Sequence, residues 1–310
     1  MNELMDRFMN LLEKNKLVLW LLILLITVLW GYAWVIMKQS LTFMGPYTFS
    51  AFRFLTGTIT LLLIVWFSKQ HIPLKKYWKQ LFIQGFLQTT VVFILVMFSL
   101  QFVGAGKSSV LLYSMPIWGS LLAAHFLKEK LSVTGIIGLI LGFFGLLLII
   151  GWDFLFETNQ QLLIGQLLII IAAIVWSISN IYFRLHLQHL PQTTTTAYQM
   201  LFGLIGLILA AIIFEWKEPL VINAYSIYYI LFSGVIASAL CFTVWFILLS
   251  LVDMMTATIS SMLVPVFGLF FSSLILDEKL TINLILGSVI IISGIVVSQL
   301  KQKKPKKAEH

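Results

Sequence analysis

Ten apolar runs, each long enough to cross a lipid bilayer, constrain the fold of this chain more than any other feature. About 20 consecutive apolar residues span the hydrocarbon core as a helix. A segment exposed to lipid must satisfy its own backbone hydrogen bonds, so each run is predicted to be helical. The predicted spans are 17–37, 46–67, 80–100, 106–127, 133–152, 162–183, 194–214, 224–250, 254–276 and 282–300.

Composition supports a membrane protein and argues against two other classes. Of the 310 residues, 60% are hydrophobic and 10% charged, whereas a soluble domain has about 25% charged residues. The single cysteine, Cys241, excludes a disulfide framework and a thiolate metal site. The net charge of +8 does not indicate nucleic acid, because five of the twenty basic residues lie in the last ten positions. A basic tail after an apolar helix is typical of contact with anionic lipid.

Basic residues in the connecting segments predict the orientation. With a cytoplasmic N-terminus, fifteen basic residues fall inside and four outside, and the four are Lys38, Lys107, Lys217 and Lys279. Cytoplasmic loops carry the excess of Lys and Arg. The asymmetry predicts a multi-pass protein of the cell membrane with both termini in the cytoplasm. The segment 1–16 is predicted to lie along the membrane surface as an amphipathic helix.

The two halves of the chain repeat each other. "MPIWGSLLAAHFLKEKLS" (115–132) matches "VPVFGLFFSSLILDEKLT" (264–281) at a distance of 149 positions. "WGYAWVIMK" (30–38) matches "WSISNIYFR" (176–184) at a distance of 146. The matching spans are five apart, so they cross the membrane in opposite directions. An inverted repeat of this kind is typical of transporters that work by alternating access.

The predicted fold is therefore an all-α integral membrane protein. Its ten transmembrane helices form two inverted five-helix repeats. The predicted parts are a cytoplasmic N-terminal segment, a first repeat, a second repeat and a basic cytoplasmic tail, at residues 1–16, 17–152, 162–300 and 301–310.

The chain resembles the drug/metabolite transporter superfamily, of the EamA type. The resemblance rests on "LWGYAWVIMKQSL" in the first span, "PYTFSAFRFLTG" in the second, and the doubled phrase of proline, twelve residues and Glu-Lys-Leu. It covers nearly the whole chain. It implies ten helices in two inverted repeats around a central cavity. It also implies a small metabolite as substrate, often an amino acid and usually exported.

Arg53 is the one strongly basic residue well inside a predicted span, about 10 Å from the start of its helix. A charge at that depth must face protein or water. Two interpretations stay open. Arg53 contacts a substrate carboxylate, or it clamps backbone carbonyls of a neighbouring helix, which is the more frequent role of a buried arginine.

Aromatic and amide side chains are predicted to line a cavity for an amphipathic metabolite. Flat amphipathic rings with a few polar groups are typical of small-molecule sites. Each can instead pack between helices or against lipid. With Arg53, the predicted substrate-binding residues are Trp30, Trp34, Gln84, Gln88, Tyr113, Trp176, Asn180 and Tyr198.

The doubled phrase supplies two further pairs of candidates. Pro116 and Pro265 each remove a helical hydrogen bond near the middle of a span. They are predicted to kink the helix with a mechanical, gating role rather than to contact a ligand. Two acid–base pairs are predicted to hold helix ends at the membrane boundary, Glu129 with Lys130 and Glu278 with Lys279.

Other functions are less well supported. The "HLQH" segment (186–189) could contribute two ligands to a metal, but no second cluster accompanies it, so neither a metal nor a cofactor is predicted. A multi-pass membrane enzyme and a non-transporting receptor or scaffold remain the alternatives. Glycine-rich faces of the fifth and tenth spans indicate close helix packing within the chain or in a homodimer.

The sequence does not name the substrate or the direction of transport. No Asp or Glu lies deep within a span, where proton-coupled pumps commonly have one. This favours facilitated diffusion or exchange.

Overall fold

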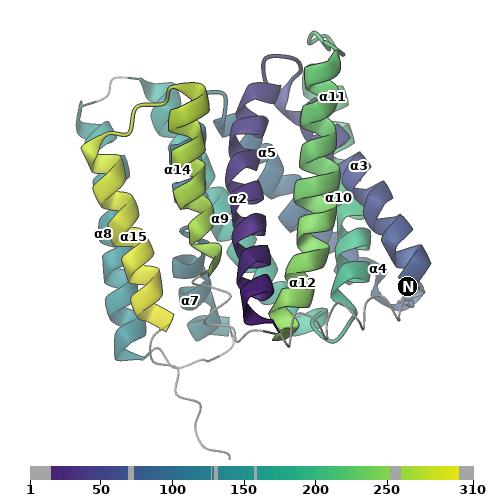
Figure 1. The fold of residues 1–310 in the computed structure, drawn as a ribbon, viewed down its shortest axis with the longest axis horizontal. Coiled ribbons are helices and arrows are strands. Elements are labelled where there is room, and N and C mark those ends of the chain that lie inside the picture. The colour runs from purple at the N-terminus through teal and green to yellow at the C-terminus, as the bar shows by residue number, and fades with distance from the viewer. Residues whose placement is uncertain are drawn as a thin grey trace, which may run out of the picture.

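Figure 1 shows a computed structural model, which describes residues 15–68, 73–126, 128, 132–156, 159–251 and 260–299. Every regular element in these ranges is a helix. Eight helices, some built from two or three consecutive elements, are long and apolar enough to cross a membrane, and two shorter apolar helices follow them at Leu263–Leu276 and Ile282–Ser298. These described parts are those of an all-α multi-pass membrane protein. Predictions for residues 1–14, Glu129, Lys130 and 301–310 lie outside the described residues.

The described part of the first half contains eight helical elements. They are α2 (Lys16–Ser40), α3 (Pro46–Ser68), α4 (Leu74–Gly85), the π-helix η1 (Phe86–Val91), α5 (Val92–Ser99), α6 (Ala105–Leu112), α7 (Met115–Phe126) and α8 (Val133–Phe156). The second half contains α9 (Gln160–His186), α10 (Gln192–Glu215), α11 (Ala224–Leu231), the π-helix η2 (Phe232–Leu240), α12 (Cys241–Leu251), α14 (Leu263–Leu276) and α15 (Ile282–Gln299).

Local sequence explains where several helices begin. The side chain of Asn15 accepts hydrogen bonds from the backbone at the start of α2, and Asn159 does the same for α9. Asn223 and Ser226 form a capping box at the start of α11. Such side chains satisfy N–H groups that have no partner within the helix.

Three predicted spans differ from the structure: the third, the fourth and the ninth, whose described part has a turn at Met262 before α14 begins at Leu263. The third was predicted over 80–100, but its helix begins at Leu74, because hydropathy marks the lipid-facing part of a helix and not its wet end. The fourth was predicted as one helix over 106–127. It is interrupted at Tyr113 and Ser114, between α6 and α7.

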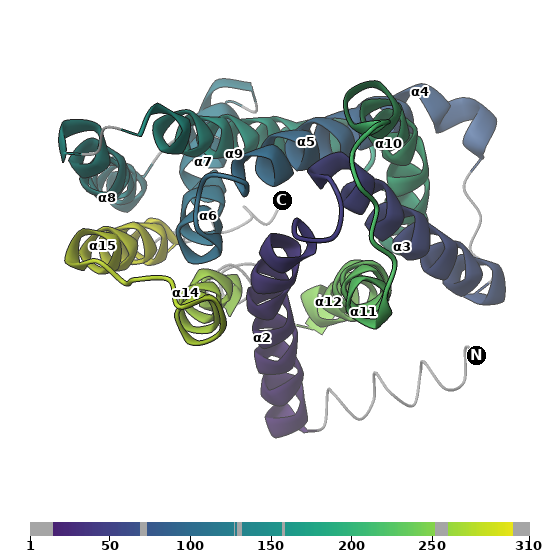
Figure 2. The same ribbon diagram turned by 90° about the horizontal axis from the view of Figure 1, so that it is seen from above.

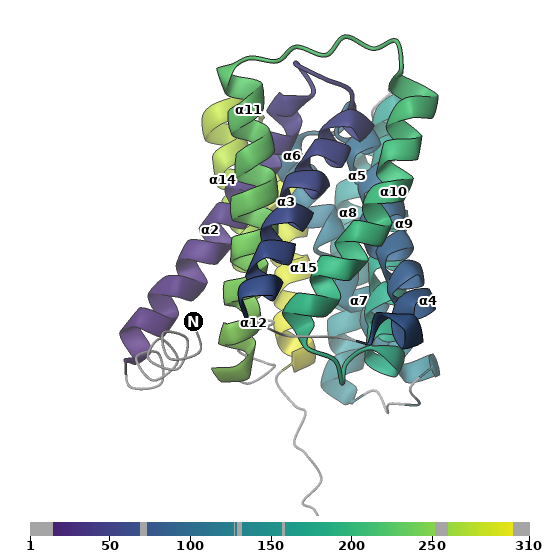
Figure 3. The same cartoon turned by 90° about the vertical axis from the view of Figure 1, so that its right-hand side faces the viewer.

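The helices pack as an upright bundle (Figures 1 and 3). Viewed from above, α2, α3, α5, α6, α12 and α14 surround its middle (Figure 2). The element pairs α3–α10, α8–α15 and α2–α14 have extensive contacts. The predicted close packing of glycines is confirmed between α8 and α15, where a methyl group on Gly145 would lie 2.8 Å from the carbonyl oxygen of Gly287.

We call one end of the bundle the Glu278 end. It holds the last residues of α2, α10 and α14 together with the first residues of α3 and α6 (Figures 1 and 3). The Lys16 end is the opposite one.

Candidate functional site

Arg53 is buried in α3 with 6% of its surface exposed. Its Nε donates a hydrogen bond to Ser238 Oγ (3.1 Å), and its Nη1 lies 2.8 Å from the sulfur of Met37. The guanidinium carbon lies 4.8 Å from the ring centre of Phe93 and 5.4 Å from that of Phe54. Among the described residues no acidic side chain pairs with Arg53. A thioether is a weak acceptor, so much of the donor capacity of this cation is left for another group.

Phe93 connects Arg53 with the sixth predicted span. Its ring centre lies 6.4 Å from that of Trp176 and 4.6 Å from that of Phe54. Both Phe93 and Trp176 are half-buried, so both rings keep some exposed surface. Arg53, Phe93 and Trp176 therefore place a cation and two aromatic rings in sequence from α3 through α5 to α9. We call these three residues the Arg53 group.

The predicted glutamines meet a third one. Gln84 Nε2 donates to Gln88 Oε1 (2.7 Å), which also accepts from Gln199 Nε2 (3.3 Å). Gln84 Nε2 further contacts Ser179 Oγ at 3.4 Å. Gln84 is 1% exposed, and its Oε1 has no hydrogen-bond partner. An unpaired buried carbonyl oxygen is costly unless a donor reaches it.

Two π-helices lie beside these groups. Ser238, the partner of Arg53, belongs to η2, while Gln88 belongs to η1. Trp30 donates its indole N–H to the carbonyl oxygen of Ala237 in η2 (2.8 Å). π-helical turns inside longer helices occur frequently at functional sites. The sequence gives no clear signal for either one.

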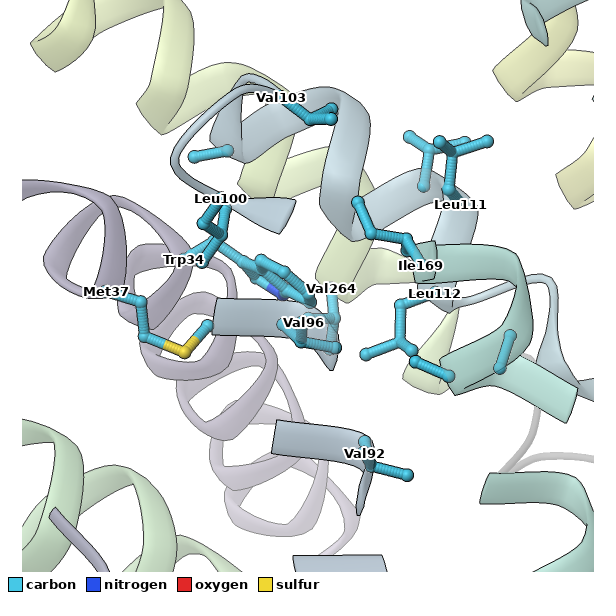
Figure 4. Packing of buried hydrophobic residues seen from close by; sticks show 14 of the residues in the cluster. Trp34, Met37, Val92, Val96, Leu100, Val103, Leu111, Leu112, Ile169 and Val264 are labelled. Atoms are coloured by element: carbon cyan, nitrogen blue, oxygen red, sulfur yellow. The ribbon is translucent and has the colours of Figure 1, made fainter. Parts of the chain in front are cut away.

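Trp34 has less access to a ligand than expected. It is 4% exposed and packs among apolar residues that include Val96 and Val264 (Figure 4). Tyr113 directly follows α6 at the interruption of the fourth predicted span, and Pro116 lies in the first turn of α7 just beyond it. Pro265 lies at the matching place in the first turn of α14. The roles of these residues in binding or gating stay predictions.

The two remaining residues predicted to bind substrate lie on α9 and α10. Asn180 is exposed in the last third of α9, and Tyr198 is half-buried in α10. His189 of the "HLQH" segment lies 3.0 Å from the hydroxyl of Tyr77. No group of three potential metal ligands comes together in the part of the chain that the structure describes.

The helix-end acid Glu278 has backbone partners. Its Oε1 accepts from the N–H of Ala105 (2.6 Å) and its Oε2 from that of Gly106 (3.1 Å), both at the start of α6. The hydrogen bonds shown for Glu278 thus reach another helix rather than the adjacent Lys279. Glu215, at the end of α10, likewise accepts from the N–H groups of Tyr47 (2.8 Å) and Thr48 (2.7 Å) at the start of α3. Carboxylates are favoured at helix N-termini.

A pocket of about 600 Å³ opens at the Glu278 end. Its lining comes from the ends of α2 and α10, the start of α3 and the segment after α5, and includes Lys38, Tyr47, Gln101, Glu215 and Glu218. None of the residues predicted to bind substrate lines it.

Comparisons with known proteins place this helical chain among transporters. The model of the EamA-like transporter family matches it twice, at residues 18–151 and 163–299. The "Uncharacterized transporter YoaV" of Bacillus subtilis is 33% identical over 277 residues, which cover 89% of this chain and 94% of the relative. A "Probable amino-acid metabolite efflux pump" of Escherichia coli is 25% identical, over 89% and 93% of the two chains.

A protein of known crystal structure shares the fold. It superposes with a TM-score of 0.67 at 16% identity and covers 93% of this chain and 98% of its own. The names of the relatives are those of transporters and pumps, which agrees with the expectation that this protein is not an enzyme. The chain belongs to the EamA-like transporter family, within the drug/metabolite transporter superfamily.

Proposed function

We propose that this transporter carries a small amphipathic metabolite with a carboxylate, such as an amino acid, and that the Arg53 group binds it. The observation that carries the proposal is the buried guanidinium of Arg53, which no acidic side chain among the described residues neutralises. An arginine at depth in a membrane costs about 2.5–3.5 kcal/mol on insertion scales and commonly marks a substrate path. A substrate carboxylate would offset that cost with bidentate hydrogen bonds.

Neighbouring residues suit the rest of such a substrate. The rings of Phe93 and Trp176 offer apolar faces, which suit an apolar side chain of the substrate. The name of the relative that is called a probable amino-acid metabolite efflux pump agrees with this substrate class and favours export.

We further propose that two inverted five-helix repeats alternate access to this site. Support comes from two contacts between glycines, because the repeat relates the residues of one contact to those of the other. Gly57 of α3 lies against Gly234 of η2, where an added methyl group would meet the carbonyl oxygen of Gly234 at 3.0 Å. Gly203 of α10 lies against Gly85, where it would meet the carbonyl oxygen of Gly85 at 2.5 Å. In the repeat, Gly57 corresponds to Gly203 at the distance of 146 positions, and Gly85 corresponds to Gly234 at the distance of 149.

The π-helices and the family model also support two related halves. The two π-helices follow Gly85 and surround Gly234, and the family model matches each half separately. With the orientation that the basic residues favour, the Glu278 end faces outward and both termini lie in the cytoplasm.

Ligand binding to the purified protein tests the substrate class. The probes are amino acids with apolar side chains, each compared with the amine that lacks its carboxylate. A ligand that binds the folded state raises the unfolding temperature with its concentration. We expect the amino acids to raise it and the matched amines to have little effect. Equal stabilisation by both members of each pair would contradict a site built around Arg53.

A further inference from the structure

We propose that Glu278 and Lys38 latch a gate between α6 and α14 at the Glu278 end. The proposal rests on the proposed transport function, because a gate has a purpose only if the site opens to both sides. It concerns residues away from the Arg53 group.

The seam between α6 and α14 is built from small residues. Gly106 of α6 lies directly against Ser272 and Leu269 of α14, and a methyl group on Gly268 would lie 2.5 Å from Ser109 Oγ. Beyond the last turn of α14, a methyl group on Gly104 would lie 2.7 Å from Glu278 Oε2. Apart from Leu269, these contacts between α6 and α14 are made by glycine and serine, so opening the seam exposes less apolar surface than parting helices that are joined by many large side chains.

Each helix of the seam covers only part of a predicted span. α6 ends at Leu112, before the interruption at Tyr113 and Ser114. α14 begins at Leu263, directly after a turn at Met262, which matches Tyr113 at the distance of 149. An interruption frees backbone hydrogen bonds and allows one half of a span to tilt without the other. The seam therefore belongs to two segments that can swing together or apart.

Opposite charges hold the connection between α5 and α6 at the end of this seam. Glu278 accepts from the N–H groups of Ala105 and Gly106, which begin α6. Lys38 of α2 donates to the carbonyl oxygens of Leu100 and of Val103 (3.1 Å), which follow α5. Lys38 also lies within electrostatic range of Glu278. These bonds involve charged groups and face the polar end of the bundle, where water can replace them when the seam opens.

The contact that Glu215 makes at the same end differs from that of Glu278. Glu215 joins α10 to α3, and these two helices also pack together extensively. Breaking the bonds of Glu215 alone would leave that helix pair in place. Breaking those of Glu278 would release the end of α14 from α6, where glycine and serine make most of the remaining contacts named above.

Thiol labelling tests the latch without a substrate. In a Cys241→Ser background, Ser109→Cys places one thiol in the seam at a residue with no exposed surface. Its reaction with a membrane-impermeant reagent is timed in vesicles of both orientations. We expect Glu278→Gln to raise the labelling rate about tenfold, as the loss of a charge-assisted hydrogen bond implies, and Lys38→Met to raise it in the same direction. The increase should appear from one side of the membrane.

Glu218→Gln is the matched control, because it removes an exposed carboxylate at the same end and should leave the rate unchanged. Size-exclusion profiles establish that each variant is folded, and Lys38→Met carries the test if Glu278→Gln does not fold. Rates within twofold of the parent for both variants would overturn the latch. An equal rise in Glu218→Gln would overturn it as well, since bulk charge would then explain the effect. Because no substrate is needed, these outcomes do not depend on whether amino acids bind.

Discussion

Arg53 is the residue on which the proposed binding site depends. Its described side-chain partners are a hydroxyl and a thioether, neither of which neutralises a buried charge. We expect Arg53→Gln to weaken binding of a carboxylate substrate about ten- to one-hundredfold, the range for a lost charge-assisted hydrogen bond. Binding of the matched amine should change little. Titration of both ligands into parent and variant measures this.

The ratio between the two affinities separates the two roles considered for Arg53. An arginine that only clamps neighbouring helices would reduce the amount of folded protein. It would leave the preference for acid over amine unchanged. A preserved preference in folded Arg53→Gln would therefore remove Arg53 from the substrate site.

Trp176 supplies the aromatic face next to Phe93. We expect Trp176→Ala to reduce flux at least about fivefold without loss of folded protein, because an aromatic contact to the substrate is lost. Trp66→Ala is the control, since Trp66 is 71% exposed on the surface of α3. Flux in reconstituted vesicles, normalised to inserted protein, measures the difference. Normal flux through correctly inserted Trp176→Ala would take Trp176 out of the site.

The residues of the site differ in how well the sequence signals them. Arg53 is conspicuous because it is a charge inside an apolar run. Phe93 carries no such signal, since one phenylalanine among many apolar residues looks like any other. Only the fold, which places α5 between α3 and α9, shows that Phe93 touches both Arg53 and Trp176. Glu278 was predicted to act with its neighbour Lys279, yet its partners in α6 are more than 170 positions away.

At the scale of elements, close glycine contacts position the helices around the site. A methyl group on Gly85 would lie 2.9 Å from the backbone nitrogen of Gly203 and even closer to the carbonyl oxygen of Gln199. A methyl group on Gly119 would find Ser177 Oγ at 3.9 Å as its nearest neighbour. We expect Gly85→Ala to lower the free energy of unfolding by about 1–3 kcal/mol through overpacking. Gly119→Ala should have little effect.

Thermal unfolding of the two variants in detergent checks this difference. Equal unfolding temperatures would show that α4 and α10 can separate without cost. The contact between Gly85 and Gly203 would then not hold the two repeats together.

Helices were predictable as elements because lipid leaves a spanning chain few alternatives. Their interruptions were predictable only in part. Pro116 predicted a kink in the fourth span, and the interruption at Tyr113 and Ser114 lies within the four residues before it, where a proline removes a hydrogen bond. The π-helices were missed altogether, because no local sequence signal marks either one.

At the scale of the whole molecule, the repeat relates the two sides of the proposed site. Arg53 and Gln199 occupy matching positions of the two halves at the distance of 146. Arg53 lies seven residues into α3 from the Glu278 end, and Gln199 lies seven residues into α10 from the Lys16 end. At this matched position the first half thus offers a cation and the second an amide, Gln199, whose partner Gln88 belongs to the first half. This difference would give the proposed pathway a preferred orientation for its substrate.

Uptake by proteoliposomes tests the central claim most directly. Labelled apolar amino acids and their matched amines are supplied with and without an imposed pH gradient. The account predicts saturable uptake of the amino acids, little uptake of the amines, and no dependence on the gradient, since no carboxylate lies deep within a predicted span. Folded protein that takes up no amino acid, or takes up the amines equally well, would contradict it.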